Sequence, residues 1–116
     1  MAETINDRLA ALGITIPESA APAANYIPWS RSGNLLFTSG QLPLENGNLI
    51  AIGKVGGELT VEDGQRAARQ CAINILAQIK LACGGDLERI VRCVRLGGFV
   101  ASTPDFTDHP KVVNGA

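Results

Sequence analysis

One long helix is predicted by the segment TVEDGQRAARQCAINILAQIKLAC, which covers residues 60–83. Thr60 can cap the first turn, and Asp63, three residues later, places a carboxylate near the positive end of the helix dipole. Gly84-Gly85 then ends the helix. One stripe of the segment is apolar, as expected of a helix that covers one face of a sheet: Ala68, Cys71, Ala72, Ile75, Leu76, Ile79 and Cys83.

One β-hairpin, followed by a second turn and a third strand, is predicted on the N-terminal side of this helix. Residues 26–31 and 34–39 have strand composition and flank a Ser32-Gly33 turn. A second turn contains Asn46-Gly47, the pair favoured in type I′ turns. Residues 49–55 are then predicted to form a third, short strand.

The remaining segments complete the predicted order of elements. Residues 3–12 have helical spacing that ends at Gly13, and an irregular connector follows. After the long helix, residues 90–101 are predicted to form a long strand and residues 111–114 to begin a second helix. This order indicates an α+β fold with one sheet packed under two helices.

The predicted second helix has only one turn before Ala116. We therefore expect residues 1–116 to form a single domain that is incomplete at its C-terminus or is completed by partner subunits. Because each large apolar side chain left uncovered forfeits about 1.5–3 kcal/mol, we expect the chain to be unstable when expressed alone.

Composition excludes several classes of function. The 116 residues carry ten Lys+Arg against eleven Asp+Glu, and only five side chains are aromatic, so nucleic acid is an unlikely partner. No apolar run reaches the roughly 20 residues of a membrane span, and residues 1–4 do not resemble a secretory signal. We expect a soluble, cytoplasmic protein.

No metal or cofactor is expected from the sequence. The three cysteines, Cys71, Cys83 and Cys93, form no C-x-x-C pair, and His109 is the single histidine, so a zinc site lacks ligands. Buried free thiols are the simplest interpretation. The Gly-Gly pairs match no phosphate-binding motif.

Few side chains indicate chemistry from their spacing alone. Ser39 ends a predicted strand, where its hydroxyl could bind a ligand or simply satisfy a backbone group of the turn. Tyr26 could line a pocket or pack against the sheet. Arg92 and Arg95 point to opposite faces of a regular strand, and one of them could bind a carboxylate or lie at an exposed or intersubunit face. Asn114 has no evident role from spacing.

Taken together, these segments resemble the RidA family, also called the YjgF or endoribonuclease L-PSP-like family. The resemblance extends from Ala21 to Ala116, and the block Thr38-Ser39-Gly40-Gln41 in its hairpin context carries much of it. Further matches lie in the long helix at Asn74-Ile75 and in the C-terminal segment at Val113-Asn114. The helix before residue 13 resembles that of a longer subgroup of the family.

The resemblance implies a chorismate-mutase-like fold that assembles as a homotrimer, with small-molecule pockets between adjacent subunits. It implies hydrolysis of reactive enamine or imine intermediates to 2-keto acids and ammonia, with no cofactor or metal. The substrate is a small molecule with a carboxylate. Tyr26, Ser39 and Asn114 match the pocket residues of the family.

The family's carboxylate-binding arginine and its water-orienting glutamate lie on elements beyond Ala116, so catalytic residues stay unassigned. A chain that ended there would lack the deaminase activity. The alternatives are a non-catalytic small-molecule-binding or protein-binding module on the same scaffold and, third, an endoribonuclease.

Overall fold

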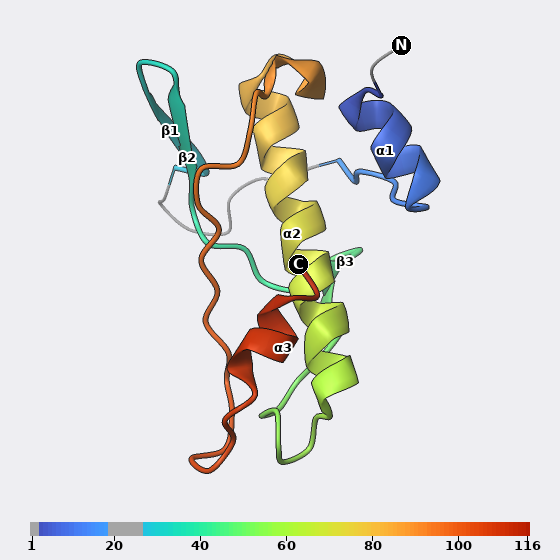
Figure 1. The fold of residues 1–116 in the computed structure, drawn as a ribbon, viewed down its shortest axis with the longest axis vertical. Helices are drawn as coiled ribbons and strands as arrows, with labels where there is room; N and C mark the ends of the chain where they lie inside the picture. The colour runs from blue at the N-terminus through green and yellow to red at the C-terminus, as the bar shows by residue number, and fades with distance from the viewer. Residues whose placement is uncertain (1–2, 19–26) are drawn as a thin grey trace. The chain divides into compact units, whose positions relative to one another are not determined.

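The computed structural model describes residues 3–18 and 27–116, which divide into two compact units. The first unit combines the chain up to Gly40 with Ile73–Val94, and the second combines Gln41–Ala72 with Arg95–Ala116. The long helix α2, Val61–Ala82, contributes its first part to the second unit and its remainder to the first (Figure 1).

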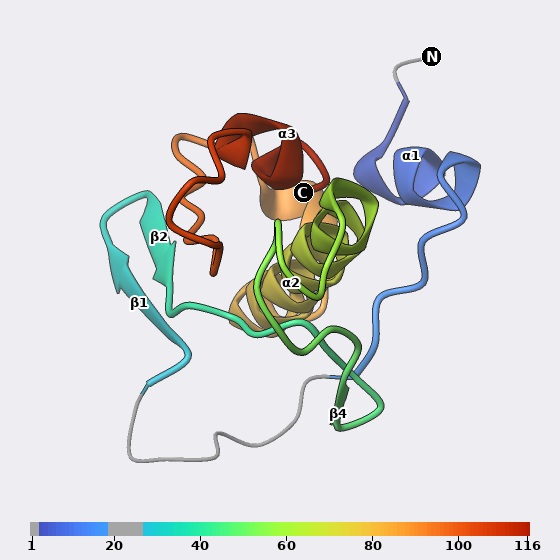
Figure 2. The same cartoon turned by 90° about the horizontal axis from the view of Figure 1, so that it is seen from below.

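The first unit contains the predicted N-terminal hairpin. Strands β1, Trp29–Ser32, and β2, Leu35–Thr38, pair antiparallel, with Ser32 opposite Leu35 (Figure 2). The turn therefore consists of Gly33-Asn34, one residue later than predicted. Gly33 has φ 58°, which a type II′ turn requires at its first central position. The expected start of the first strand at Tyr26 lies outside the described residues.

The predicted N-terminal helix is confirmed in the same unit as α1, Ile5–Ala11. Thr4 and Asp7 form a capping box at its start. A second carboxylate comes from the 3-10 helix η1, Leu87–Arg89: Glu88 accepts the backbone N–H groups of Ile5 and Asn6 at 2.8 and 2.9 Å. Because these N–H groups have no partner inside the helix, Glu88 ties α1 to η1.

The boundaries of α2 agree with prediction. The Thr60 hydroxyl accepts the Asp63 N–H at 3.1 Å, and the Asp63 carboxylate accepts the Thr60 N–H at 2.9 Å. Gly84 and Gly85 both have positive φ, and the Gly85 N–H returns to the Lys80 carbonyl at 2.8 Å.

The apolar stripe of α2 is half-buried along its length. Two residues off the stripe, Ala77 and Gln78, are buried instead. The stripe predicts which face avoids water, but burial also depends on which segments actually pack there.

The second predicted turn is confirmed, and it joins two short strands, of which the first was not predicted. Strands β3, Leu44–Glu45, and β4, Asn48–Leu49, flank Asn46-Gly47, whose φ values of 52° and 81° fit a type I′ turn. The prediction of one strand over residues 49–55 is wrong: β4 ends at Leu49. Gly53 has φ 134°, which breaks an extended run, and Val55 makes only isolated bridges.

The predicted strand over residues 90–101 is also wrong. Its end bonds to Val55, whose N–H donates to the Ala101 carbonyl at 2.9 Å and whose carbonyl accepts the Thr103 N–H at 3.1 Å. The rest of the segment has no ladder, and an extended sequence becomes a strand only when another backbone satisfies its polar groups. The described residues are thus mixed α and β, as the class predicted, but with two hairpins in place of a single sheet.

The core of the second unit forms where α3, His109–Val113, packs on the start of α2 (Figure 2). The predicted second helix is confirmed and begins two residues earlier than expected. Val55 and Val112 are 3% and 4% exposed, and both approach Gly64. A Cβ at Gly64 would lie 3.0 Å from Val112 Cγ1 and 3.1 Å from Val55 Cγ2, so any larger residue would push against both valines.

Acid is expected to weaken the start of α2. The Thr60 backbone N–H lowers the pKa of the Asp63 carboxyl, and the Thr60 hydroxyl and the Arg66 guanidinium lower this pKa further. The folded pKa lies below the unfolded value of about 3.9, so the stabilisation is present above about pH 4 and is lost as pH falls through the folded pKa. We expect the backbone NMR chemical shifts of the first turn of α2 to move towards random-coil values as the pH falls below about 4. In the Asp63→Asn variant these chemical shifts should not change over the same pH range. If the variant showed the same pH-dependent change as the wild type, Asp63 would not be its cause.

Candidate functional site

The contact between α2 and α3 in the second unit positions the predicted site residue Asn114. The Gln65 Nε2 group donates to the Lys111 carbonyl at 2.9 Å. A Cβ on Gly115 would overlap the backbone carbonyl of Gln65, so only glycine allows the chain to approach α2 this closely. The segment after α3 is therefore held against the first turns of α2.

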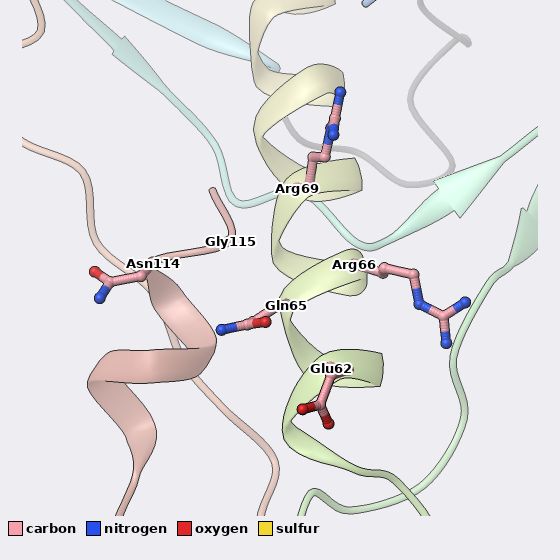
Figure 3. A pocket seen from close by; sticks show the side chains of 6 residues that line it. All are labelled: Glu62, Gln65, Arg66, Arg69, Asn114 and Gly115. Carbon is pink, nitrogen blue, oxygen red and sulfur yellow. The ribbon is translucent and has the colours of Figure 1, made fainter. Parts of the chain in front are cut away.

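A surface pocket of about 400 Å³ lies at this contact (Figure 3). Figure 3 shows Gln65 between α2 and the end of α3, whereas the Asn114 carboxamide points away from α2 and is exposed.

The charged side chains that line this pocket all come from α2. Arg66 forms an ion pair with Asp63, and its guanidinium points to the side of α2 opposite Asn114 (Figure 3). Arg69 lies one turn further along the helix and supplies guanidinium donors that match a carboxylate. Helical spacing of three residues places both arginines near the pocket, a signal that sequence reasoning did not use.

Ser39 belongs to the first unit and is half-buried where β2 ends. Its N–H and its hydroxyl both donate to the Pro28 carbonyl, at 2.9 and 3.3 Å. The hydroxyl thus satisfies a backbone group of the hairpin, the structural alternative considered from the sequence. A ligand role for Ser39 stays a prediction.

Tyr26, Arg92 and Arg95 are the remaining candidates. Tyr26 lies outside the described residues. Arg92 and Arg95 are both exposed, because the segment that carries them has no strand partner. This agrees with the exposed alternative for the two arginines.

Sequence reasoning missed a contact between Ser102 and His109. Their Oγ and Nε2 atoms are 3.0 Å apart, and the His109 ring meets the Phe106 ring edge-on with centroids 5.2 Å apart. His109 begins α3, so this contact helps to fix where the helix starts. Spacing gives no signal, because the turn between the two residues is irregular.

Metal and thiol chemistry have no support in the described ranges 3–18 and 27–116. No cluster of three or more His, Cys, Asp or Glu side chains could hold a metal ion there. All three cysteines are free thiols, and burial raises the pKa of the Cys71 thiol. The expectation that all three are buried is wrong: Cys93 is exposed, since residues 90–101 form no ladder, and the other two are half-buried.

The contact of α1 with η1, the contact of α2 with α3 and the two antiparallel hairpins make this a small mixed α/β protein. It carries a surface pocket lined by polar side chains. Within the described part of the chain, no helix combines the length and hydropathy needed to cross a bilayer. The sequence model of the family described as "YjgF/chorismate mutase-like, putative endoribonuclease" matches residues 6–116. The chain belongs to this family, as the resemblance indicated.

The chain is similar in sequence to a protein of Trypanosoma cruzi and in sequence and fold to two solved structures. The chain is 47% identical over 105 residues to Protein TCP17 of Trypanosoma cruzi, a match that covers 90% of this chain and 65% of that protein. It is 51% identical to Atu1372 of Agrobacterium tumefaciens, a protein of unknown function, with a TM-score of 0.84 over 93% of this chain and 66% of that one.

A third relative is described as a "putative endoribonuclease" from Shewanella oneidensis. It is 41% identical, with a TM-score of 0.90 over 97% of this chain and 74% of that one. The chain spans just under two thirds of the length of TCP17 and of Atu1372.

Proposed function

We propose that the protein is a RidA-type enamine/imine deaminase that acts on small, carboxylate-bearing intermediates and works as a homotrimer. Water adds to the C=N bond of the imine, and the resulting carbinolamine loses its C–N bond. Ammonia leaves with the nitrogen, and a 2-keto acid remains. No electrons are transferred in this hydrolysis.

The position of Asn114 carries the proposal. The Gln65–Lys111 hydrogen bond and the close approach of Gly115 to α2 fix the backbone on either side of Asn114. The exposed carboxamide is therefore presented from a fixed backbone. A carboxamide offers both donors and an acceptor, so it can bind a substrate carboxylate or an imine nitrogen.

The chemistry of the pocket agrees with a small anionic substrate. Gln65 and Arg69 supply N–H donors, and charged hydrogen bonds to a carboxylate are stronger than neutral ones. Holding the carboxylate in place is what an imine hydrolase needs in order to direct water to one carbon atom.

RNA cleavage is a second candidate, because the family description and the Shewanella relative both name an endoribonuclease. Arg66 and Arg69 are side chains of the kind that contact phosphate. The formal net charge of −1 gives no basic excess for an RNA backbone, so this candidate ranks below the deaminase.

Deaminase activity is expected to fall when Asn114 is replaced by alanine. A lost hydrogen bond to a charged group costs about 1.5–3 kcal/mol, so kcat/KM for 2-iminobutanoate should fall about 10- to 100-fold. Ser39→Ala should lower kcat/KM by about 2- to 10-fold, with a smaller effect on folding. The imine is generated in situ, and the release of 2-keto acid and ammonia is measured with the full-length protein.

Asn48→Ala is the matched control, because Asn48 is an exposed asparagine of the β3–β4 hairpin. It should leave kcat/KM unchanged. Absence of imine hydrolysis by the wild-type protein would overturn the proposal, and cleavage of an RNA probe that depends on Arg69 would favour the second candidate. A loss of melting temperature in Ser39→Ala with unchanged kcat/KM would make Ser39 purely a turn residue.

A further inference from the structure

A second pocket of about 270 Å³ lies in the same unit, at the start of α2. Residues after β4 and before α2 provide an apolar wall, and β3 and α2 provide the charged groups. The lining comprises Glu45, Ile50, Ala51, Leu59, Asp63 and Arg66. The Asn114 pocket shares only Arg66 with it.

Arg66 is directed to this second pocket. Figure 3 shows its guanidinium on the side of α2 that faces away from Gln65 and Asn114. The ion pair with Asp63 uses the Nη2 nitrogen. A guanidinium has five N–H donors, so donors on the other nitrogens remain for a ligand carboxylate.

Asp63 acts as a fixed anchor for Arg66. Its other carboxylate oxygen accepts the Thr60 N–H, so both oxygens are engaged by the protein. Glu45 differs, since no described residue hydrogen-bonds to its carboxylate. The pocket therefore presents one carboxylate without a described partner, one anchored guanidinium and an aliphatic wall.

From these three features we infer that the pocket binds a zwitterionic α-amino acid with a short aliphatic side chain. The ammonium pairs with Glu45, the carboxylate pairs with Arg66, and the side chain lies against Ile50 and Leu59. The inference does not depend on the proposed deaminase activity, because the site differs from the Asn114 pocket.

Other ligands fit these groups less well. A phosphate would be repelled by the two carboxylates, which outnumber the single arginine. A divalent cation would meet the Arg66 charge, and the described residues form no metal-binding cluster. A purely apolar ligand would leave Glu45 and Arg66 desolvated without partners.

Titration with L-valine tests the inference. Binding is measured by NMR shifts of residues 45–51 and 63–66 in the full-length protein. We expect saturable binding to the wild type, at least tenfold weaker binding to Glu45→Gln and to Arg66→Gln, and retained folding by circular dichroism. Two control variants, Glu58→Gln and Arg8→Gln, should bind valine as the wild type does, because neither residue lines the pocket.

Two analogues separate the contributions of the charges. N-acetyl-valine lacks the ammonium and isobutylamine lacks the carboxylate, so each should bind at least tenfold more weakly than valine. If isobutylamine bound as tightly as valine, the pocket would be a site for simple cations, and the inference would be overturned. Absence of saturable valine binding, or loss of binding in Arg8→Gln alone, would also overturn it.

Discussion

Replacing Leu87 by alanine is expected to lower the free energy of unfolding by about 2–5 kcal/mol. Leu87 is 2% exposed and is the largest fully buried side chain among the described residues. Truncation removes apolar surface and leaves a cavity, because η1 and its neighbours relax only in part. Against a total stability of about 5–15 kcal/mol, this loss would unfold a substantial fraction of a marginal protein.

Leu81→Ala provides the matched control, because it deletes the same atoms at a position that is 52% exposed. Urea unfolding should show a much smaller shift for this variant. Leu87→Ala should also speed hydrogen exchange of the Ile5 and Asn6 amides, since Glu88, which binds both, follows Leu87 directly. Equal shifts of the urea midpoint in the two variants would contradict a core role for Leu87.

Replacing Val112 by aspartate is expected to destabilise the second unit by about 3–5 kcal/mol at neutral pH. Val112 is 4% exposed and packs on Gly64, so an ionised carboxylate there would lose its water without gaining a partner. The pKa of the introduced carboxyl would be raised by burial. Its destabilisation should therefore shrink as pH falls through this raised pKa, because the neutral form costs less to bury.

Val91→Asp makes the same exchange at a position that is 95% exposed. We expect a change within about 0.5 kcal/mol, with no pH dependence beyond that of the wild type. Denaturant unfolding of both variants at pH 7 and near pH 4 makes the comparison. A Val112→Asp variant as stable as Val91→Asp would show that α3 is not packed on α2.

Only part of the candidate site could be predicted from the sequence. Family resemblance selected Asn114, and the structure places it at the edge of the pocket that Gln65 and Arg69 also line, with its carboxamide directed away from α2. These residues come together because α3 approaches α2 closely at Gly64 and Gly115, and at Gly115 the backbone of Gln65 leaves no space for a Cβ, which sequence spacing does not reveal. The Ser102–His109 contact could not be predicted either, because an irregular turn with no characteristic spacing separates the two residues.

The sequence by itself determined the elements whose causes are local. Capping at Thr60, termination at Gly84-Gly85 and the Asn46-Gly47 turn follow from backbone preferences and from hydrogen bonds within a few residues. Tertiary structure determined the conformation of residues 90–101. Their composition fits a strand, but they form none, because almost no other backbone segment hydrogen-bonds to them. A helix satisfies its own N–H and C=O groups, whereas a strand needs a second chain segment at the correct distance and register, and no local pattern supplies that.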